Sequence, residues 1–481
     1  MRILIHTNGN PIKSAGGYSG VIRTLGRIFS GNPNNEVFFF LTCFNKSSNK
    51  ILSLTEIINT ERTNLSTLNN TDKKMLNNVS YVLHKDVFMD IEVINNAVKK
   101  YKIDLFFTLC DILIFSDKKG KGIEIPCACW WPCHYDPIDN RSIQSLKIFD
   151  RIFSLCPTVT AMLMKILPDK HITFCPHIIE YEEDKSLKKE EIRKKFKIPL
   201  KSFVWLVNAK HYEQSNRKSY DDFMMAYLKF LKKHPNSYLY MNNANTRRVR
   251  CPLDFTIPDK YPVGTIIKVK YSDKDIDVPY NPQYKPGKTY SAQIELTCKE
   301  SPNGIYDIKV LAKLLKIPED KYHINDEELT EQKLKELYHC ADVLIAATKS
   351  EGFGLPVLEA QAVGLPVVTT DYLAMGDFTF NGISHKPLQK LYQPLQTAFW
   401  VQPSQEGIAK AAEDIKNWSY RKRTANKIRG QYIIKGMMSY NSVKNVLISN
   451  LKTLNFKKKN VKKKKKKKKS SLEMNIRKAF Q

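Results

Sequence analysis

Short apolar segments that alternate with helical segments constrain the fold of this chain more than any other feature. RILIH (2–6), DLFFTLC (104–110) and RIFSL (151–155) are mostly apolar. Strands of this kind, buried on both faces, are typical of parallel sheets with helices on either side. EVFFFLTCF, VSYVLH, IEIPCACW and HITFCPH repeat the pattern, and helices are expected near 18–29 and 90–100.

A second alternation begins after a charged linker at 178–200. Its strands are SFVWLVNA, SYLYMN, ADVLIAAT and PVVTT, and its helices are expected at 220–233, 306–316 and 330–340. The sequence therefore predicts an α/β protein with two doubly wound, Rossmann-like domains. The carboxyl ends of their strands would face a common cleft, where such folds bind ligands.

The pattern also predicts the domain boundaries. A stretch rich in Asn, Ser, Thr and Lys interrupts the first domain, and we expect it to be a poorly ordered, low-complexity insertion with one helix. A proline-rich stretch with strand-like pieces interrupts the second domain as a β-rich insertion. The predicted parts are 1–180 (insertion 45–80), 181–420 (insertion 246–300), closing helices at 421–456 and a tail at 457–481.

The positive charge of the chain is concentrated at its carboxyl end. The formal net charge is +29, and residues 457–481 hold thirteen Lys and Arg and one acid. A run of lysines repels itself and buries nothing apolar, so this tail is predicted to be disordered. It is either a solvated tail or, through Lys457–Lys469, an attachment to an anionic membrane or nucleic acid.

The start of the chain and the length of its apolar runs indicate a cytoplasmic protein. MRILIHTNGN has a short apolar part that polar residues follow at once, which differs from a signal peptide. No apolar run reaches the roughly 18 residues that a membrane span needs. Membrane contact through the tail would then be peripheral.

Three of the ten cysteines cluster in CACWWPC, at Cys127, Cys129 and Cys133. Their spacing fits no common zinc pattern and their neighbours are apolar. We interpret them as buried thiols of a strand rather than as a metal site.

The segment KSEGFGLPVLEAQAVGLPVVTTD (349–371) holds the main candidate residues. Glu351 falls in the loop between the strand ADVLIAAT and a helix whose first turn contains Pro356. The glycines of GFG let backbone amides approach a ligand, and the helix amino terminus favours an anion. Glu359 lies about one turn into the helix, where it could accept hydrogen bonds from a vicinal diol such as that of ribose.

At these residues the chain resembles glycosyltransferase family 4, the retaining nucleotide-sugar transferases of GT-B fold. EGFGLPVLEA is similar to the paired-glutamate motif of that family, and GLPVVTT is similar to its continuation. The resemblance implies that Glu351 contacts the donor sugar near the reacting carbon and that Glu359 contacts the ribose. Gly352, Phe353 and Gly354 would present backbone amides.

Two further loops of the second and first domains extend the resemblance. VNAKHYEQSNRKSYDDF places Lys210, Arg217 and Lys218 between a strand and a helix, where cations would bind a leaving diphosphate. Of these, Lys218 is the first candidate, with Arg217 or Lys210 as the second cation. NGNPIKSAGGYSG resembles the glycine-rich loop after the first strand, and Gly16 and Gly17 would let it approach donor phosphate and acceptor.

WWPCHYDPID follows a buried strand and should also reach the cleft. His134 is the candidate for a polar group beside the reacting bond, and Asp136 is second. His177, in CPHIIE, marks the end of the first domain and is interpreted as structural.

The resemblance implies a hexosyltransferase that uses a UDP- or GDP-hexose. Residues 1–180 would bind the acceptor, which the tail could concentrate if it is lipid-linked or anionic, and residues 181–420 would bind the donor. Basic side chains and a helix terminus can stabilise the departing diphosphate without a metal or other cofactor. Front-face attack with retained configuration would follow.

Three alternatives stay open at this level. A metal-dependent transferase would need an Asp-x-Asp clamp, which DKDID supplies at Asp273, Asp275 and Asp277. A phosphorylase could share the two-domain fold. A basic scaffold without catalysis could bind nucleic acid or membrane through the tail.

Overall fold

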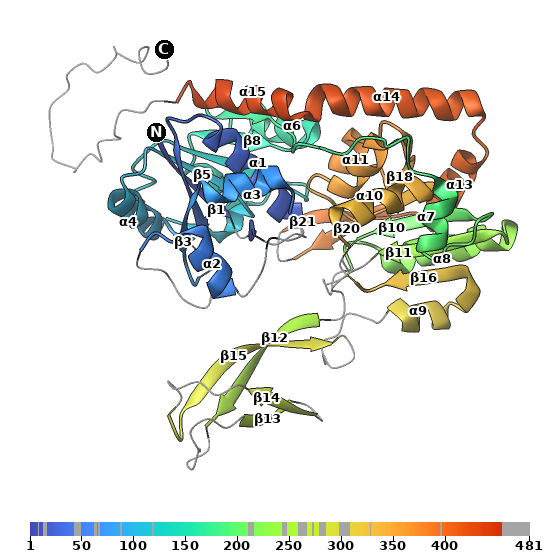
Figure 1. Ribbon diagram of the computed structural model, residues 1–481, viewed down its shortest axis with the longest axis horizontal. Helices are drawn as coiled ribbons and strands as arrows, with labels where there is room; N and C mark the ends of the chain where they lie inside the picture. Colours follow the sequence, from blue (N-terminus) through green and yellow to red (C-terminus); the bar gives the residue numbers. More distant parts are fainter. Residues whose placement is uncertain are drawn as a thin grey trace.

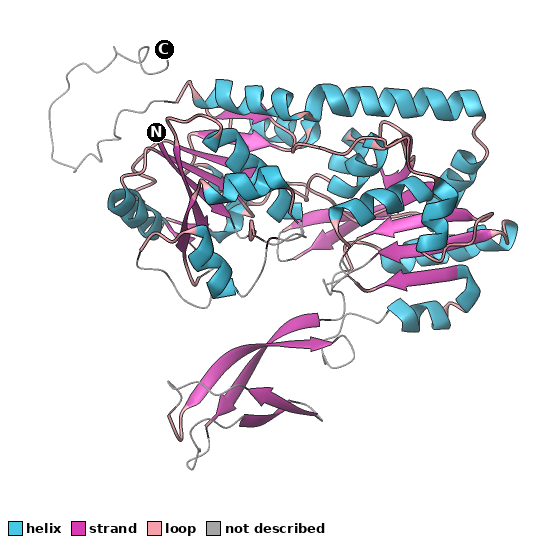
Figure 2. Cartoon of the chain, viewed as in Figure 1, coloured by secondary structure: helices cyan, strands magenta, loops and turns pink. Residues whose placement is uncertain are grey.

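Two parallel sheets with helices on both faces form the body of the protein (Figures 1 and 2). This computed structural model describes residues 1–7, 9–12, 17–42, 50–61, 65, 68–86, 89–117, 120–209, 216–242, 248–257, 267–271, 274–278, 285–297, 308–327, 329–394 and 397–454. The predicted fold class is confirmed: each sheet is doubly wound and Rossmann-like.

The first sheet has seven parallel strands in the order β3-β2-β1-β5-β7-β8-β9. All five residues of β5 are buried, as expected for a strand covered on both faces. The strands are β1 (Arg2–Thr7), β2 (Glu36–Leu41), β3 (Ser80–Leu83), β5 (Leu105–Leu109), β7 (Cys127–Trp131), β8 (Arg151–Ser154) and β9 (His171–Phe174). Around them lie α1 (Gly17–Ser30), α4 (Ile91–Tyr101), α5 (Asn140–Leu146), α6 (Pro157–Ile166), the 3₁₀ helix η1 (Ile112–Ile114) and the short pair β4 (Met89–Asp90) and β6 (Phe115–Ser116).

The segment predicted as a poorly ordered insertion contains two packed helices, α2 (Leu54–Glu61) and α3 (Asn70–Asn77). The prediction of poor order with one helix was wrong in that two helices are packed here, because a few apolar side chains at helical spacing suffice to anchor them. Ile57 and Leu76 are fully buried, and Asp72 forms a buried ion pair with Arg23 of α1 at 2.8 Å. Residues 43–49 lie outside the described part of the chain.

The second sheet has six parallel strands in the order β16-β11-β10-β17-β18-β19. Its edge strands were not predicted, since YHIN and GISH are short, polar and only partly buried. The strands are β10 (Phe203–Asn208), β11 (Ser237–Asn242), β16 (Tyr322–Asn325), β17 (Val343–Ala346), β18 (Val367–Thr370) and β19 (Gly382–His385). The helices are α7 (Lys189–Lys195), α8 (Tyr220–Lys233), α9 (Ile308–Leu314), η2 (Glu319–Lys321), α10 (Glu331–Cys340), α11 (Leu355–Ala362), α12 (Ala374–Asp377) and α13 (Gln405–Lys416).

The insertion between β11 and α9 is β-rich, as predicted, and projects from the body in Figure 1. It pairs β12 (Arg248–Thr256) with β15 (Thr289–Thr297) and β13 (Ile267–Tyr271) with β14 (Lys274–Val278), both antiparallel. Asp275 and Asp277 lie in β14, whereas Asp273 lies outside the described residues. The candidate metal clamp therefore belongs to this projection and not to the strand ends of either parallel sheet.

A hairpin and two long helices connect the two halves of the body. The hairpin pairs β20 (Gln389–Gln393) with β21 (Ala398–Gln402), and it was not predicted. Helices α14 (Tyr420–Met438) and α15 (Tyr440–Leu451) run along one side of the molecule across both sheets (Figure 1). Met438 O accepts a 3.0 Å hydrogen bond from Ile179 N, which returns the chain to the first half. Within the described residues, no helix is both long and apolar enough to span a membrane.

The clustered cysteines are buried thiols, as predicted. Cys127 and Cys129 lie in β7, Cys133 follows it, and all three are free. Burial raises the pKa of the Cys133 thiol well above its usual range, so it stays protonated. Among the described residues, no group of three or more His, Cys, Asp or Glu side chains is arranged to hold a metal ion.

Candidate active site

Glu351 lies in the loop between β17 and α11, at the carboxyl edge of the second sheet. Its carboxylate Oε2 accepts a hydrogen bond from Lys218 Nζ, and Arg217 Nη1 lies 3.4 Å from the same oxygen. Both cations are largely buried, with 19% and 11% of their side chains exposed. Two cations and one carboxylate therefore meet where the carboxyl ends of β10 and β17 are adjacent.

Burial by itself would raise the pKa of Glu351, but the neighbouring charges of Lys218 and Arg217 and the Lys218 hydrogen bond lower this pKa to about 2. His134 acts in the same direction. The Glu351 carboxylate is consequently ionised throughout the neutral pH range.

Arg217 and Lys218 lie in the loop between β10 and α8, which is hydrogen-bonded to the Glu351 loop. Arg217 Nη1 donates to Ser350 O at 3.0 Å, and Lys349 N donates to Arg217 O at 2.8 Å. These bonds fix the basic loop against the acidic one. The third predicted cation, Lys210, lies outside the described residues.

The first half reaches the same place through the loop after β7. Ser350 Oγ donates a hydrogen bond to the backbone oxygen of His134. A Cβ atom at Gly352 would lie 3.1 Å from Pro132 O, so this close approach of the two halves favours glycine. The structure thus places His134 beside the Glu351 loop.

Asp136 points to a different neighbour. Its carboxylate lies 3.7 Å from Lys390 Nζ, and its backbone pairs with Phe399 of the β20–β21 hairpin. Through these contacts Asp136 connects the loop after β7 to that hairpin.

The predicted amide-bearing residues, Gly352, Phe353 and Gly354, form the turn before α11. Gly354 has φ 85°, in the left-handed region that favours glycine, and a Cβ atom there would also displace the end of the Met375 side chain. Phe353 is buried, and its ring packs edge-to-face on His177 with centroids 4.8 Å apart. Burial lowers the pKa of His177 to about 3, which fits its interpretation as a structural residue.

Glu359 lies at the end of a chain of side-chain hydrogen bonds that sequence reasoning missed. Tyr338 of α10 donates to Glu359 Oε2 at 2.8 Å, and Asn208 Nδ2 donates to the Tyr338 hydroxyl at 2.7 Å. Asn242 donates to Asn208 at 2.9 Å, and Asn325 donates to Asn242 at 2.8 Å. The three asparagines end the adjacent strands β10, β11 and β16, and this shared position is the sequence signal that could have revealed them.

The environment of Glu359 is opposite to that of Glu351. Burial raises the pKa of Glu359 to about 7; the Tyr338 hydrogen bond opposes this shift and the charge of Glu331 adds to it. Among the described residues, only Tyr338 donates a hydrogen bond to this carboxyl group, on Oε2. A ligand hydroxyl could therefore bind at Oε1.

The glycine-rich loop of the first half is described only in part. Gly17 is the first residue of α1, and Gly16 lies outside the described residues. The role predicted for both stays a prediction.

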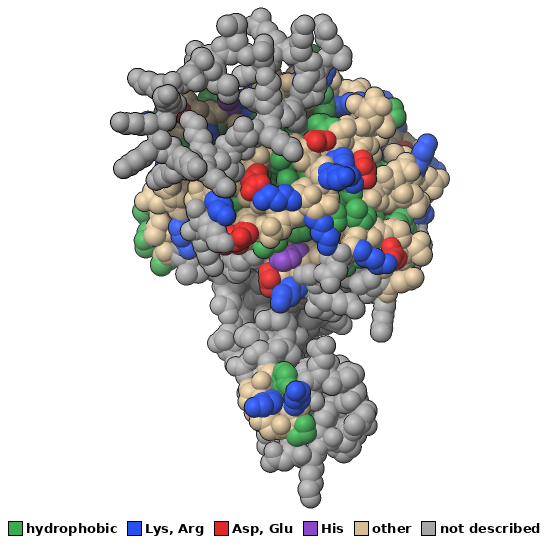
Figure 3. Space-filling model, turned by 90° about the vertical axis from the view of Figure 1, so that its left-hand side faces the viewer, with side chains coloured by type: hydrophobic (Ala, Val, Ile, Leu, Met, Phe, Trp, Pro, Cys, Tyr) green, Lys and Arg blue, Asp and Glu red, His purple; other side chains and the backbone are tan. Residues whose placement is uncertain are grey.

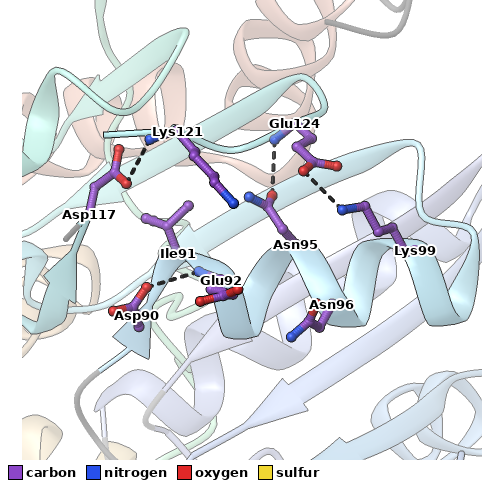
Figure 4. Close-up of a pocket in the computed structure, with 9 residues that line it drawn as sticks. All are labelled: Asp90, Ile91, Glu92, Asn95, Asn96, Lys99, Asp117, Lys121 and Glu124. Carbon is purple, nitrogen blue, oxygen red and sulfur yellow. Dashed lines mark hydrogen bonds and ion pairs between the residues drawn. The ribbon is translucent and has the colours of Figure 1, made fainter. Parts of the chain in front are cut away.

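A surface pocket at the start of α4 is separate from this site (Figure 4). Asp117 accepts from Lys121 N and Gly122 N, and Asn95 bonds Gly122 O and Glu124 N, at 2.8–3.0 Å. Lys99 pairs with Glu124 at 3.0 Å. These polar groups satisfy one another and hold the loop before β7.

Comparison with known proteins agrees with this geometry. Residues 307–430 match the profile of the family described as glycosyl transferases group 1, and this segment contains Glu351 and Glu359. The chain carries a glycosyltransferase domain. No curated protein matches the chain in a sequence search.

Solved structures of glycosyltransferases share the fold of both halves of the protein. A glycosyltransferase from Rickettsia africae is 14% identical, with a TM-score of 0.56 over 94% of this chain and 97% of that one. Sucrose-phosphate synthase from Thermosynechococcus elongatus is 12% identical, with a TM-score of 0.58 over 94% and 98%. Alr3699/HepE from Anabaena, solved with UDP and glucose, is 10% identical, with a TM-score of 0.57 over 94% and 100%. Together the profile and the fold identify the enzyme as a glycosyltransferase of GT-B architecture.

Proposed function

We propose that this glycosyltransferase moves a hexose from a nucleotide-diphosphate sugar to an acceptor hydroxyl, with retained configuration and without a metal. The observation that carries the proposal is the convergence of Lys218, Arg217 and the start of α11 on Glu351. The Anabaena neighbour was solved with UDP and glucose and also with UDP-glucose, which supports a UDP-hexose as the donor.

The donor would bind to the second half, residues 181–420. Its diphosphate would lie against Lys218, Arg217 and the amides before α11, because cations and free amides stabilise negative charge. The ribose diol would donate to Glu359, about one helical turn further along α11. Residues 1–180 would bind the acceptor, with His134 beside the reacting carbon.

Catalysis would stabilise the charge that develops as the nucleotide diphosphate leaves. Preorganised cations perform this task without reorganisation during the reaction. Glu351 would hold the donor sugar hydroxyls as an acceptor of hydrogen bonds. Because Lys218 and Arg217 already engage its carboxylate, Glu351 is a poor nucleophile, and direct front-face attack is favoured over a covalent intermediate.

A screen of nucleotides and sugar nucleotides tests the donor. A true donor raises the melting temperature by mass action, so UDP and GDP with their hexose conjugates would separate the two bases. NMR of the first product formed then gives the anomeric configuration. An inverted anomer would contradict the retaining mechanism.

EDTA treatment and the Lys218→Gln variant test whether the reaction is independent of a metal. We expect donor turnover to survive EDTA and to fall by about 100-fold or more in Lys218→Gln, as for loss of an oxyanion contact. Asp275→Asn with Asp277→Asn is the matched control and should retain activity. A strict manganese requirement that this double variant abolishes would support the metal-clamp alternative instead.

We further propose that the protein is cytoplasmic and attaches peripherally to anionic membranes through Lys457–Lys469. The match of residues 307–430 to a glycosyltransferase family favours this enzyme over a scaffold without catalysis. The tail would then concentrate the enzyme where a lipid-linked or anionic acceptor lies.

A further inference from the structure

The outward face of α14 carries exposed apolar and basic side chains. Ile428 and Tyr432 are 60% and 80% exposed, and Arg421, Arg429 and Lys435 are exposed beside them. At 3.6 residues per turn these five positions fall on one side of the helix. We call them the α14 outer face.

The opposite side of α14 already packs on the protein. Gly430, Ile434 and Met438 are buried, and a Cβ atom at Gly430 would lie 2.9 Å from Asn381. A surface helix of a globular protein is usually polar on its solvent side. With Ile428 and Tyr432, α14 carries apolar side chains on its solvent side as well as on its buried side.

The segment that contains this face carries charges of one sign. From residue 415 to residue 472 the chain contains twenty Lys and Arg and no Asp or Glu. Lys427 faces inward and pairs with Glu183 at 2.5 Å, and Lys435 lies 3.6 Å from the exposed Glu182, whereas Arg421 and Arg429 form no ion pair with any described residue. By contrast, Lys and Arg are interspersed with Asp and Glu on the side of the first half in Figure 3.

We propose that the α14 outer face rests on the surface of an anionic lipid bilayer. An interfacial helix lies in the membrane plane with aromatic and aliphatic residues at the boundary and basic residues against the headgroups. Tyr432 and Ile428 supply the former, and Arg421, Arg429 and Lys435 supply the latter. A nucleic acid would use the basic residues but would gain little from an exposed isoleucine.

The position of α14 gives this contact a consequence for the active site. The helix is roughly 28 Å long at 1.5 Å per residue, packs beside α11 and returns to the first half at Met438. Docking along α14 would therefore orient both halves relative to the membrane. The polylysine tail would add attraction, whereas the α14 outer face would set the orientation.

Vesicle sedimentation of the full chain tests the charge of the face. Arg421→Gln, Arg429→Gln and Lys435→Gln together should raise the lipid concentration for half-binding by at least about tenfold, on vesicles with about 30 mol% phosphatidylserine. The matched control removes three exposed lysines from other elements, Lys194→Gln, Lys201→Gln and Lys232→Gln. Equal weakening by the two triple variants would overturn the proposal, because it would show only a general charge effect.

A tryptophan placed on the α14 outer face tests whether this face enters the bilayer or whether the tail alone tethers the protein. Ile428→Trp should be quenched by brominated phospholipid, while Leu314→Trp, on the exposed end of α9, should not. Quenching of neither tryptophan would show that the tail alone holds the protein. Tighter binding to single-stranded DNA than to vesicles at the same salt, equally sensitive to the α14 triple variant, would instead assign the face to nucleic acid.

Discussion

Glu351 and Glu359 are eight positions apart, yet the fold holds their carboxyl groups in opposite electrostatic states. Two cations lower the pKa of Glu351 to about 2, whereas burial raises the pKa of Glu359 to about 7. The ionised Glu351 carboxylate is suited to a site where charge develops during the reaction. The Glu359 carboxyl group suits a ligand group that donates hydrogen bonds.

Replacing each glutamate by glutamine should separate these roles. Glu351→Gln should cut turnover by roughly 100-fold or more, with little change in nucleotide affinity, because a transition-state contact is lost. Glu359→Gln should weaken nucleotide binding by about 1.5–3 kcal/mol, because a diol loses a charged acceptor. Steady-state kinetics and calorimetry with the nucleoside diphosphate measure the two effects. Full activity in both variants would show that the motif is not the active site.

Tyr338 should position Glu359 for the nucleotide. A diol donates to the ionised carboxylate, so nucleotide affinity should rise as pH increases through about 7, the folded pKa of Glu359. Tyr338→Phe removes a bond that lowers this pKa, so its affinity profile should move to higher pH while kcat changes little. Calorimetric titrations between about pH 6 and pH 9 would measure the shift.

Tyr181→Phe is the matched control for this experiment. The Tyr181 ring packs edge-to-face on Tyr338 with centroids 6.0 Å apart, but its hydroxyl makes no hydrogen bond to Glu359. The control should leave the pH profile in place. If both variants lower affinity equally at every pH, Tyr338 serves packing only.

At the scale of elements, the loop between β10 and α8 holds Lys218 in a constrained backbone. Asn216 and Ser219 have φ values of 47° and 55°, in the left-handed region that favours glycine. Asn216 Oδ1 accepts a hydrogen bond from Tyr220 N, the first amide of α8, at 3.0 Å. Ser219 is fully buried, and its hydroxyl has no hydrogen-bond partner among the described residues.

Ser219→Gly should therefore stabilise the protein. Glycine relieves the positive φ, and the substitution removes an unsatisfied buried hydroxyl. Together these two gains in the free energy of unfolding should exceed the cost of the added entropy of the unfolded chain by about 1 kcal/mol. The free energy of unfolding from urea titration measures this change. Ser404→Gly is the control, because Ser404 Oγ accepts from Gly407 N at 3.0 Å and its loss should destabilise α13. A lower stability of Ser219→Gly would show that the hydroxyl has a favourable role there.

At the scale of the whole molecule, the two halves meet through contacts distant in sequence, and the tail lies beyond them. Ser350 binds His134 and Gly352 packs on Pro132, so the site spans both sheets. The described site residues end at Glu359, and residues 455–481 lie outside the described part of the chain. The tail is thus separable from the site in sequence.

Truncation after Phe456 should leave transfer to a soluble acceptor nearly unchanged. It should reduce sedimentation with anionic vesicles below detection, since the eleven lysines of 457–469, at about 1 kcal/mol each, are removed with the tail and the α14 outer face contributes less. About 0.5 M salt should have the same effect on the full chain by screening. Unchanged vesicle binding after truncation would show that the lysines form only a solvated tail.

The sequence by itself determined the two parallel sheets and the acidic motif. Continuous apolar strands such as β5 and β10 can be buried only between layers of helices. The glycines and proline between Glu351 and Glu359 predict a strand-to-helix turn from local sequence alone. Local patterns of this kind need no knowledge of distant residues. The β-rich insertion was predictable for the same reason.

Only the tertiary structure decided which distant residues meet. The edge strands β16 and β19 are half-buried, so they lack the apolar run that marks a central strand. Helix α2 depends on contacts with β3, and α3 depends on contacts with α1. The bonds from Asn325 through Asn242, Asn208 and Tyr338 to Glu359 join residues on four elements to α11. Each of these residues is unremarkable alone, because strand order and register set the distances between side chains far apart in sequence.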